Sequence, residues 1–149
     1  MTFRMSHQEI ESYFQQQKQD GSQQQYKINN REIHFITAGD STKPMVLFIH
    51  GSPGSRSAFI GFLANDQLVE KAFLISTDRP GFGHSNFGKA ERSLVKQAAA
   101  LHPILNQYKR NQPVLLVGHS LGGPLATEMA ILYPDLISGL ILVAPSIDP

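Results

Sequence analysis

Residues 118–122, Gly118-His119-Ser120-Leu121-Gly122, place a serine between two glycines at a spacing that could present a nucleophile. Four consecutive apolar residues, 114–117, precede them and predict a strand that is buried on both faces. Residues 124–133 continue as a predicted helix. A strand, a tight Gly-x-Ser-x-Gly turn and a helix form a nucleophile elbow, which lifts one serine hydroxyl clear of the sheet. This arrangement favours attack by the Ser120 hydroxyl on an acyl group.

The two glycines of this turn have a predicted physical purpose. Because the strand and the helix approach each other closely, a Cβ atom at Gly118 or Gly122 is expected to collide with its surroundings. Ser120 itself is expected in a rarely populated backbone region, which proteins tolerate at functional sites. Two other interpretations are an ordinary glycine-rich turn around a solvated serine and a phosphate-binding loop. The loop is disfavoured, because no Lys-Ser/Thr pair follows and Gly-x-Gly-x-x-Gly spacing is absent.

Further predicted strands alternate with predicted helices around this turn. We expect strands at residues 45–49, 72–76 and 137–143, and helices at residues 57–71 and 93–108. Ser93 is the predicted N-cap of the second helix, and Pro103 inside it predicts a kink or a restart. The alternation predicts right-handed crossovers, and hence an α/β fold whose mostly parallel sheet has helices on both faces.

Polar residues and glycines gather where these predicted strands end. In open α/β sheets, ligands bind beyond the carboxyl ends of the parallel strands. Four segments follow predicted strands at that edge: His50-Gly51, Asp78-Arg79, Ser120 and Pro145-Ser146. Their convergence predicts one site, with the serine hydroxyl as its reactive group.

Residues 1–25 are predicted to form an N-terminal helix and a polar connector ahead of the sheet. The helix is expected over residues 6–18, with Ser6 as its N-cap and Glu9 as the capping-box partner. One apolar stripe along it comprises Ile10, Tyr13 and Phe14. The stripe predicts packing against the domain; membrane or partner binding is disfavoured, because the polar face is rich in glutamine rather than basic.

Residues 26–149 are predicted to form one portion of an α/β domain. It opens with a half-buried antiparallel hairpin at the sheet edge, whose strands cover residues 26–30 and 31–37 around the turn Asn29-Asn30. Outside the hairpin, Phe59, Phe62 and Phe82 could line the mouth of an apolar pocket. Core packing is the expected role for at least two of these three rings.

The composition bounds the class of protein. The chain has 149 residues, 41% of them apolar, which suits one domain with a real core. Its formal net charge of +1 is scattered, so neither nucleic acid nor an anionic membrane surface is an expected partner. Cysteine is absent, which excludes disulfides and thiolate metal sites. With no apolar leader or spanning segment in the sequence, we expect a cytoplasmic protein that uses no cofactor and no metal ion.

Three signatures in order resemble the α/β-hydrolase superfamily of the serine esterase type. They are His50-Gly51-Ser52-Pro53-Gly54, Asp78-Arg79-Pro80-Gly81-Phe82-Gly83-His84-Ser85 and Gly118-His119-Ser120-Leu121-Gly122-Gly123. The resemblance covers residues 26–145. It implies that Ser120 is the nucleophile and that the backbone N–H groups of Ser52 and Leu121 form the oxyanion hole. Gly51, Pro53 and Gly54 would let the Ser52 amide point inward, and His50 would make a structural hydrogen bond.

The resemblance also implies the chemistry. A serine at the elbow, where some branches carry an aspartate, disfavours epoxide hydrolases and dehalogenases. It favours a small acyl substrate such as an ester, thioester or amide, or a diketone cleaved at a carbon–carbon bond. The reaction would pass through an acyl-serine intermediate.

The sequence differs from the family pattern in the remaining members of the catalytic triad. Hydrolases of this type carry the order Ser, Asp/Glu, His, and no segment after Pro149 is present to supply the acid and the histidine. We expect His7 and His34 at the surface and His119 pointing away from the nucleophile, and neither His84 nor His102 is a favoured base. Asp148 is a candidate acid, although a loop aspartate before proline is the favoured interpretation.

The chain is therefore expected to be the N-terminal part of a serine hydrolase, inactive or weak on its own. The alternative is a non-catalytic half-domain that binds a partner chain or a small ligand through its open sheet edge. Residues 137–143 would form that edge, and an apolar edge strand with unpaired amides invites self-association.

Overall fold

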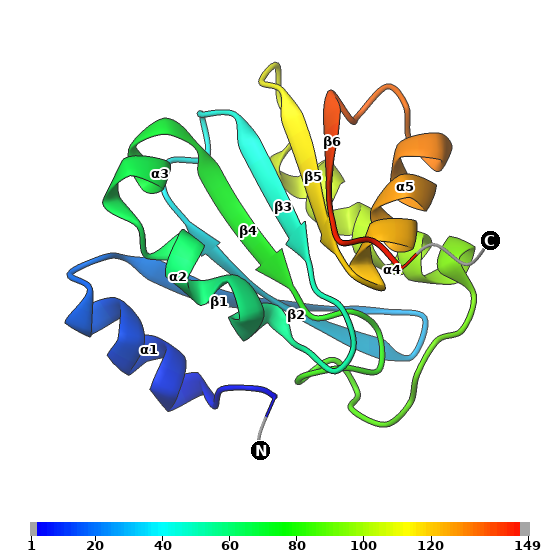
Figure 1. Cartoon of the computed structure of the whole chain (residues 1–149), viewed down its shortest axis with the longest axis horizontal. Coiled ribbons are helices and arrows are strands. Elements are labelled where there is room, and N and C mark those ends of the chain that lie inside the picture. The colour runs from blue at the N-terminus through cyan, green and yellow to red at the C-terminus, as the bar shows by residue number, and fades with distance from the viewer. Residues whose placement is uncertain (1–2, 147–149) are drawn as a thin grey trace.

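The structure of the protein is a computed structural model that describes residues 3–146. Its centre is one six-stranded sheet in the order β1-β2-β4-β3-β5-β6 (Figure 1). The strands are β1 (Gly21–Ile28), β2 (Arg31–Ala38), β3 (Met45–Ile49), β4 (Phe73–Thr77), β5 (Val114–His119) and β6 (Gly139–Val143). Strands β4, β3, β5 and β6 run parallel, whereas β1 and β2 form an antiparallel hairpin that joins β4. The predicted mostly parallel sheet is confirmed.

Helices cover both faces of the sheet, as predicted. The helices are α1 (His7–Gln16), the 3₁₀ turn η1 (Arg56–Phe59), α2 (Ile60–Leu63), α3 (Asp66–Lys71), α4 (Leu94–Tyr108) and α5 (Gly122–Leu132). One core lies between the sheet and α4 and α5; the other lies between the opposite face and α1 and α2 (Figure 1). Among the helices of residues 3–146, none combines the length and the apolar character that crossing a membrane requires.

The N-terminal hairpin differs from its prediction in extent and in burial. Strand β1 begins at Gly21, whereas the sequence predicted a polar connector up to residue 25. Its glutamines pair with β2, and an edge strand needs only one buried face, so a polar run can still form it. Residues 33–38 of β2 are all buried rather than half-buried, because the sheet continues beyond β2 and helices cover both of its faces. The turn at Asn29-Asn30 is confirmed, with both residues at positive φ.

The helices follow their predicted caps more closely than their predicted lengths. Ser6 and Glu9 form the predicted capping box of α1, and Ser93 caps α4. Helix α4 continues through Pro103, so of the predicted kink or restart, the restart does not occur. The predicted helix over residues 57–71 is instead three short pieces, because Asn65 caps a new start at α3. These pieces place η1 directly after the loop at the end of β3.

Candidate active site

The predicted turn at Ser120 connects β5 to α5 at the carboxyl edge of the parallel strands. Ser120 has a φ of +50°, which confirms the predicted rare backbone conformation. Its N–H donates to the Val143 carbonyl at 3.0 Å, and its carbonyl accepts from the N–H groups of Gly123 at 2.9 Å and Ser146 at 3.0 Å. The end of β6 and the start of α5 therefore hold the strained residue from both sides.

Close packing explains the glycines around Ser120. A Cβ atom at Gly118 would lie 2.6 Å from the Gly122 carbonyl oxygen and 2.7 Å from Gly123 Cα, which confirms the predicted collision. At Gly122 the collision is with the Ile49 carbonyl at the end of β3 rather than with β5. A Cβ atom at Gly51 would lie 2.8 Å from Ser120 Cβ and 3.3 Å from its Oγ atom. The loop after β3 thus lies against the serine side chain.

The two backbone N–H groups expected to form the oxyanion hole have no partner among residues 3–146. Neither Ser52 nor Leu121 donates its N–H to an acceptor of the described chain. Leu121 directly precedes α5, so its amide lies at the positive end of the helix dipole. Ser120 is half-buried, and its Oγ atom makes no hydrogen bond within residues 3–146. A serine hydroxyl and two amides that are free within residues 3–146, on adjoining loops, are groups that the stabilisation of an oxyanion would require.

His50 makes the structural hydrogen bonds predicted for it. Its ring is fully buried, with Nδ1 2.7 Å from the Gly51 carbonyl oxygen and Nε2 3.0 Å from the Arg79 amide nitrogen. Since the carbonyl accepts and the amide donates, Nδ1 carries the ring proton. Burial lowers the pKa of His50 to about 4. His50 therefore joins the loop after β3 to the loop after β4 as a neutral ring, and both of its nitrogens are occupied.

This buried ring makes stability sensitive to acid. The unfolded chain protonates His50 near its ordinary pKa of 6.5, whereas the folded chain does so only at a pKa of about 4. The free energy of unfolding should therefore fall by about 2 kcal/mol between pH 6.5 and pH 5 through this residue. Burial also lowers the pKa values of His34 and His84, which adds to the loss. The free energy of unfolding, measured with urea at each pH, should change less with pH in His50→Gln than in the wild type. An equal change in both proteins would refute the role of His50 in this acid sensitivity.

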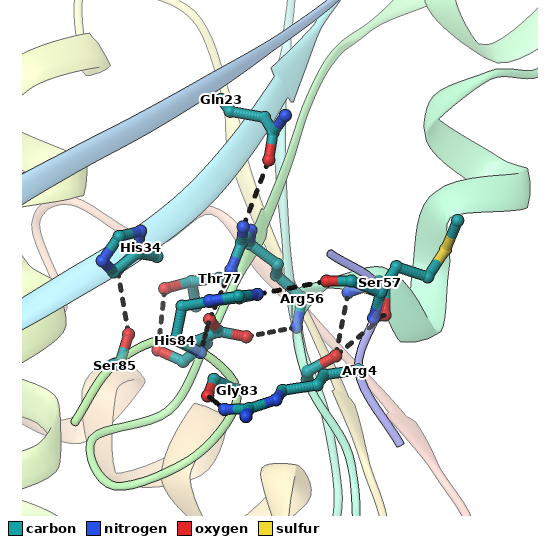
Figure 2. A network of polar contacts seen from close by, with 12 residues as sticks. Arg4, Gln23, His34, Arg56, Ser57, Thr77, Gly83, His84 and Ser85 are labelled. Atoms are coloured by element: carbon teal, nitrogen blue, oxygen red, sulfur yellow. Dashed lines mark hydrogen bonds and ion pairs between the residues drawn. The ribbon is translucent and has the colours of Figure 1, made fainter. Parts of the chain in front are cut away.

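A buried ion pair that the sequence did not indicate supports the same loops. Arg56 Nη1 lies 2.7 Å from Asp78 Oδ2, and the Arg56 amide donates to Asp78 Oδ1 at 2.6 Å. The His84 amide donates to the same carboxylate at 2.8 Å, and Arg56 Nη2 donates to Gln23 on β1 at 3.2 Å (Figure 2). The pair thus connects β1, η1 and the loop after β4. Asp78 stood out at a strand end, but an arginine in a polar turn carries no sequence signal of burial.

None of the histidines hydrogen-bonds to the Ser120 hydroxyl within residues 3–146, and three of them lie together. The rings of His7, His34 and His84 lie 4.7 to 5.8 Å apart. His7 is exposed as predicted, but His34 is buried, so its predicted surface position is wrong; it lies on β2, which the sheet and the N-terminal segment cover. His119 is exposed, and His102 stacks on Tyr133 at 4.1 Å. Asp148, the candidate acid, lies outside the described residues.

A cavity of about 890 Å³ opens beside the elbow. Arg79, Phe82, Leu121, Gly123 and Ser146 are among the residues that line it. Another cavity, of about 600 Å³, is lined by the end of β2. Because β2 runs antiparallel to β4, that second cavity lies at the sheet edge opposite Ser120. Of these two cavities, only the one beside the elbow lies at the edge of the sheet that carries Ser120.

The three phenylalanines considered for the pocket mouth have different positions. Phe82 lines the cavity beside the elbow, whereas Phe59 is part of the core under α2. Phe62 stacks on Phe48 at 5.7 Å but is 52% exposed, so core packing holds for Phe59 alone. Within residues 3–146, no group of three or more His, Asp or Glu side chains is placed to hold a metal ion.

Comparisons with known proteins agree with this geometry. A profile of the alpha/beta hydrolase fold family matches residues 44–149. The abhydrolase domain-containing protein abhd-5.2 of Caenorhabditis elegans is 34% identical over 135 residues, which cover 81% of this chain and 29% of that protein. Epoxide hydrolase 4 of Mus musculus is 27% identical over 119 residues, which cover 78% of this chain and 32% of that protein.

A solved structure shows the same arrangement of elements. The thioesterase domain from the curacin biosynthetic pathway superposes with a TM-score of 0.72 at 28% identity, covering 85% of this chain and 47% of that one. The chain spans about a third of the length of the first curated relatives that it matches.

Proposed function

Because this chain belongs to the alpha/beta hydrolase fold family, we propose that it is part of a serine hydrolase that acts on a small acyl substrate. The observation that carries the proposal is the corner at Ser120. The serine has a φ of +50°, its Oγ atom faces Gly51, and the amides of Ser52 and Leu121 are unpaired within residues 3–146. A hydroxyl nucleophile beside two free donors supports acyl transfer more directly than any other chemistry.

In this proposal the Ser120 oxygen attacks the carbonyl carbon of an ester or thioester. The carbonyl oxygen becomes an oxyanion that accepts from the amides of Ser52 and Leu121, and each donor stabilises the transition state by about 3 kcal/mol. The serine proton passes to a base and then to the departing alcohol or thiol, which leaves an acyl-serine. Water then attacks the carbonyl carbon of the acyl-serine, the bond between that carbon and Ser120 Oγ breaks, and the carboxylic acid leaves as the hydroxyl regains its proton. The curacin thioesterase domain, similar in fold, supports a thioester as one substrate class.

The proposal assigns the base and the acid to residues beyond the described chain. No histidine hydrogen-bonds to Ser120 within residues 3–146, and His50 has both of its ring nitrogens engaged. A serine without a base is a weak nucleophile, so this chain alone should be inactive or weak. Asp148 remains the candidate acid within the sequence.

The test is hydrolysis of 4-nitrophenyl butyrate and of a butyryl thioester by the natural gene product. We expect turnover of both, and we expect the mass of one butyryl group on the peptide that contains Ser120 when the reaction is stopped by acid. Rates equal to those in buffer, with no acylated peptide, would contradict the proposal. The effect of removing Ser120 is considered in the Discussion.

The edge of β6 supports a second candidate, a half-domain that binds another chain. Within residues 3–146, β6 pairs with β5 alone. Its residues 140–143 are four consecutive large apolar residues, and Ile141 is 49% exposed. Apolar edge strands with unpaired backbone groups associate readily. The 149-residue chain should therefore sediment as a dimer or larger species, and Ile141→Lys should shift it towards monomer; a monomeric wild-type chain would rule this candidate out.

A further inference from the structure

Two arginines are buried close to the candidate active site, and only one of them has a carboxylate partner within residues 3–146. Arg56 is 1% exposed and pairs with Asp78 at 2.7 Å. Arg79 is 5% exposed, yet it makes no ion pair with any carboxylate of residues 3–146. Burial of a charge without a counter-ion is costly unless other groups compensate for the lost water. Within residues 3–146, Arg79 is therefore a buried cation without a counter-ion.

The contacts of the Arg79 guanidinium compensate only in part for the lost water. Nε donates to the neutral amide oxygen of Gln97 at 3.1 Å, and the guanidinium carbon lies 4.9 Å from the centre of the Phe82 ring. Nη1 is buried and has no hydrogen-bond partner in the described chain. Burial lowers the pKa of Arg79 from its ordinary value. An aromatic face attracts the cation but accepts no full hydrogen bond, so the terminal nitrogens are left for another acceptor.

Arg79 lines the same cavity as the residues that flank the nucleophile. Leu121 and Ser146 belong to this lining, and the Ser146 amide donates to the Ser120 carbonyl at 3.0 Å. Glu91 also lines the cavity, but its carboxylate pairs with Arg31 at 3.3 Å and accepts from the Ser93 amide at 3.1 Å. Glu128, a further lining residue, makes no ion pair within residues 3–146. No carboxylate of the described chain therefore neutralises Arg79.

We infer that Arg79 binds a carboxylate at the far end of the substrate's acyl chain. The substrate class is then a monoester or monothioester of a dicarboxylic acid. This inference rests on the proposed function, because it places the acyl chain between Ser120 and the guanidinium. A guanidinium suits the role, since its planar donors match the two oxygens of a carboxylate. The Arg79 amide also donates to His50, so the binding residue and the loop that carries Ser52 are held together.

The test compares two esters of equal carbon count, mono-4-nitrophenyl glutarate and 4-nitrophenyl pentanoate. In the natural gene product, Arg79→Met should lower the ratio of kcat/KM for the anionic ester to kcat/KM for the neutral ester by about 10- to 100-fold. Arg79→Lys should restore part of the ratio, because the charge returns without the planar fork. A merely structural role would lower both values together, and an unchanged ratio in Arg79→Met would overturn the inference.

Arg92→Met is the matched comparison. Arg92 lines the same cavity but is exposed, so removing its charge tests the general field of the cavity. The ratio should change by about twofold or less, because water and salt screen exposed charges. If Arg92→Met changed the ratio as much as Arg79→Met, the inference of a specific contact between Arg79 and the substrate carboxylate would be overturned.

A binding measurement separates this inference from the proposed function. If neither ester is hydrolysed, the proposed function fails. Calorimetric titration with glutarate then tests, independently of catalysis, whether Arg79 binds a carboxylate. Binding to wild type that Arg79→Met reduces by about tenfold or more would support the site. Absence of binding to wild type, or equal binding to both proteins, would overturn it.

Discussion

Replacing Ser120 with alanine should lower kcat/KM for 4-nitrophenyl butyrate by about 10,000-fold or more in the natural gene product. The oxygen proposed to form the acyl intermediate is lost, whereas the backbone of the corner is kept by its hydrogen bonds to Val143 and Gly123. The unpaired amides of Ser52 and Leu121 remain in the variant. A residual rate above that in buffer is therefore expected, because the proposed oxyanion hole would still stabilise attack by water.

The matched control is Ser22→Ala, which removes a hydroxyl of the same type elsewhere. Ser22 is exposed and lies on β1, the strand at the far edge of the sheet from β6. Its removal should leave kcat/KM within about twofold of the wild-type value, as is usual for exposed positions. A loss of similar size in both variants, or full activity in Ser120→Ala, would contradict a nucleophilic role for Ser120.

Breaking the buried ion pair should produce the largest loss of stability. Arg56→Met leaves the Asp78 carboxylate buried without its cation, and Asp78→Asn leaves the Arg56 guanidinium buried without its anion. Each variant should lower the free energy of unfolding by about 3–5 kcal/mol. Both side chains are at most 1% exposed, so water cannot replace the missing partner. Denaturant unfolding of the natural gene product at pH 7 gives the value for each variant.

Two further variants separate the effect of the pair from the effect of charge. The double variant Arg56→Met/Asp78→Leu removes both charges, and it should recover part of the lost stability, because no buried charge stays unpaired. Arg31→Met breaks the partly exposed pair with Glu91 and should cost about 1 kcal/mol or less. Single variants at Arg56 and Asp78 that cost no more than Arg31→Met would contradict the importance of the buried pair.

The elbow could be predicted from the sequence because its geometry is local. A short apolar run, two glycines around a serine and the following helix specify where the chain must turn. Ser120 has the positive φ predicted for this turn, and Gly118 lies where a Cβ atom would collide. The parallel sheet could also be predicted, because the alternation of strands and helices can be read along the chain. Each of these features depends on residues that are neighbours in the chain.

The features that the sequence did not reveal depend on residues far apart in the chain. Arg56 and Asp78 are joined only because the loops after β3 and β4 meet at the sheet edge. His34 is buried because α1 and β4 reach β2 from distant parts of the chain, and nothing in its own strand indicates this. The polar start of β1 was missed because pairing with β2, rather than apolar burial, makes it a strand.

The position of a covalent adduct tests directly whether Ser120 is the nucleophile. The natural gene product is treated with a fluorophosphonate, which reacts with activated serines, and the modified peptide is identified by mass spectrometry. We expect one adduct, on the Ser120 hydroxyl, and none in Ser120→Ala. An adduct on another serine, or ester hydrolysis that continues while Ser120 stays unmodified, would contradict the assignment of Ser120 as the nucleophile.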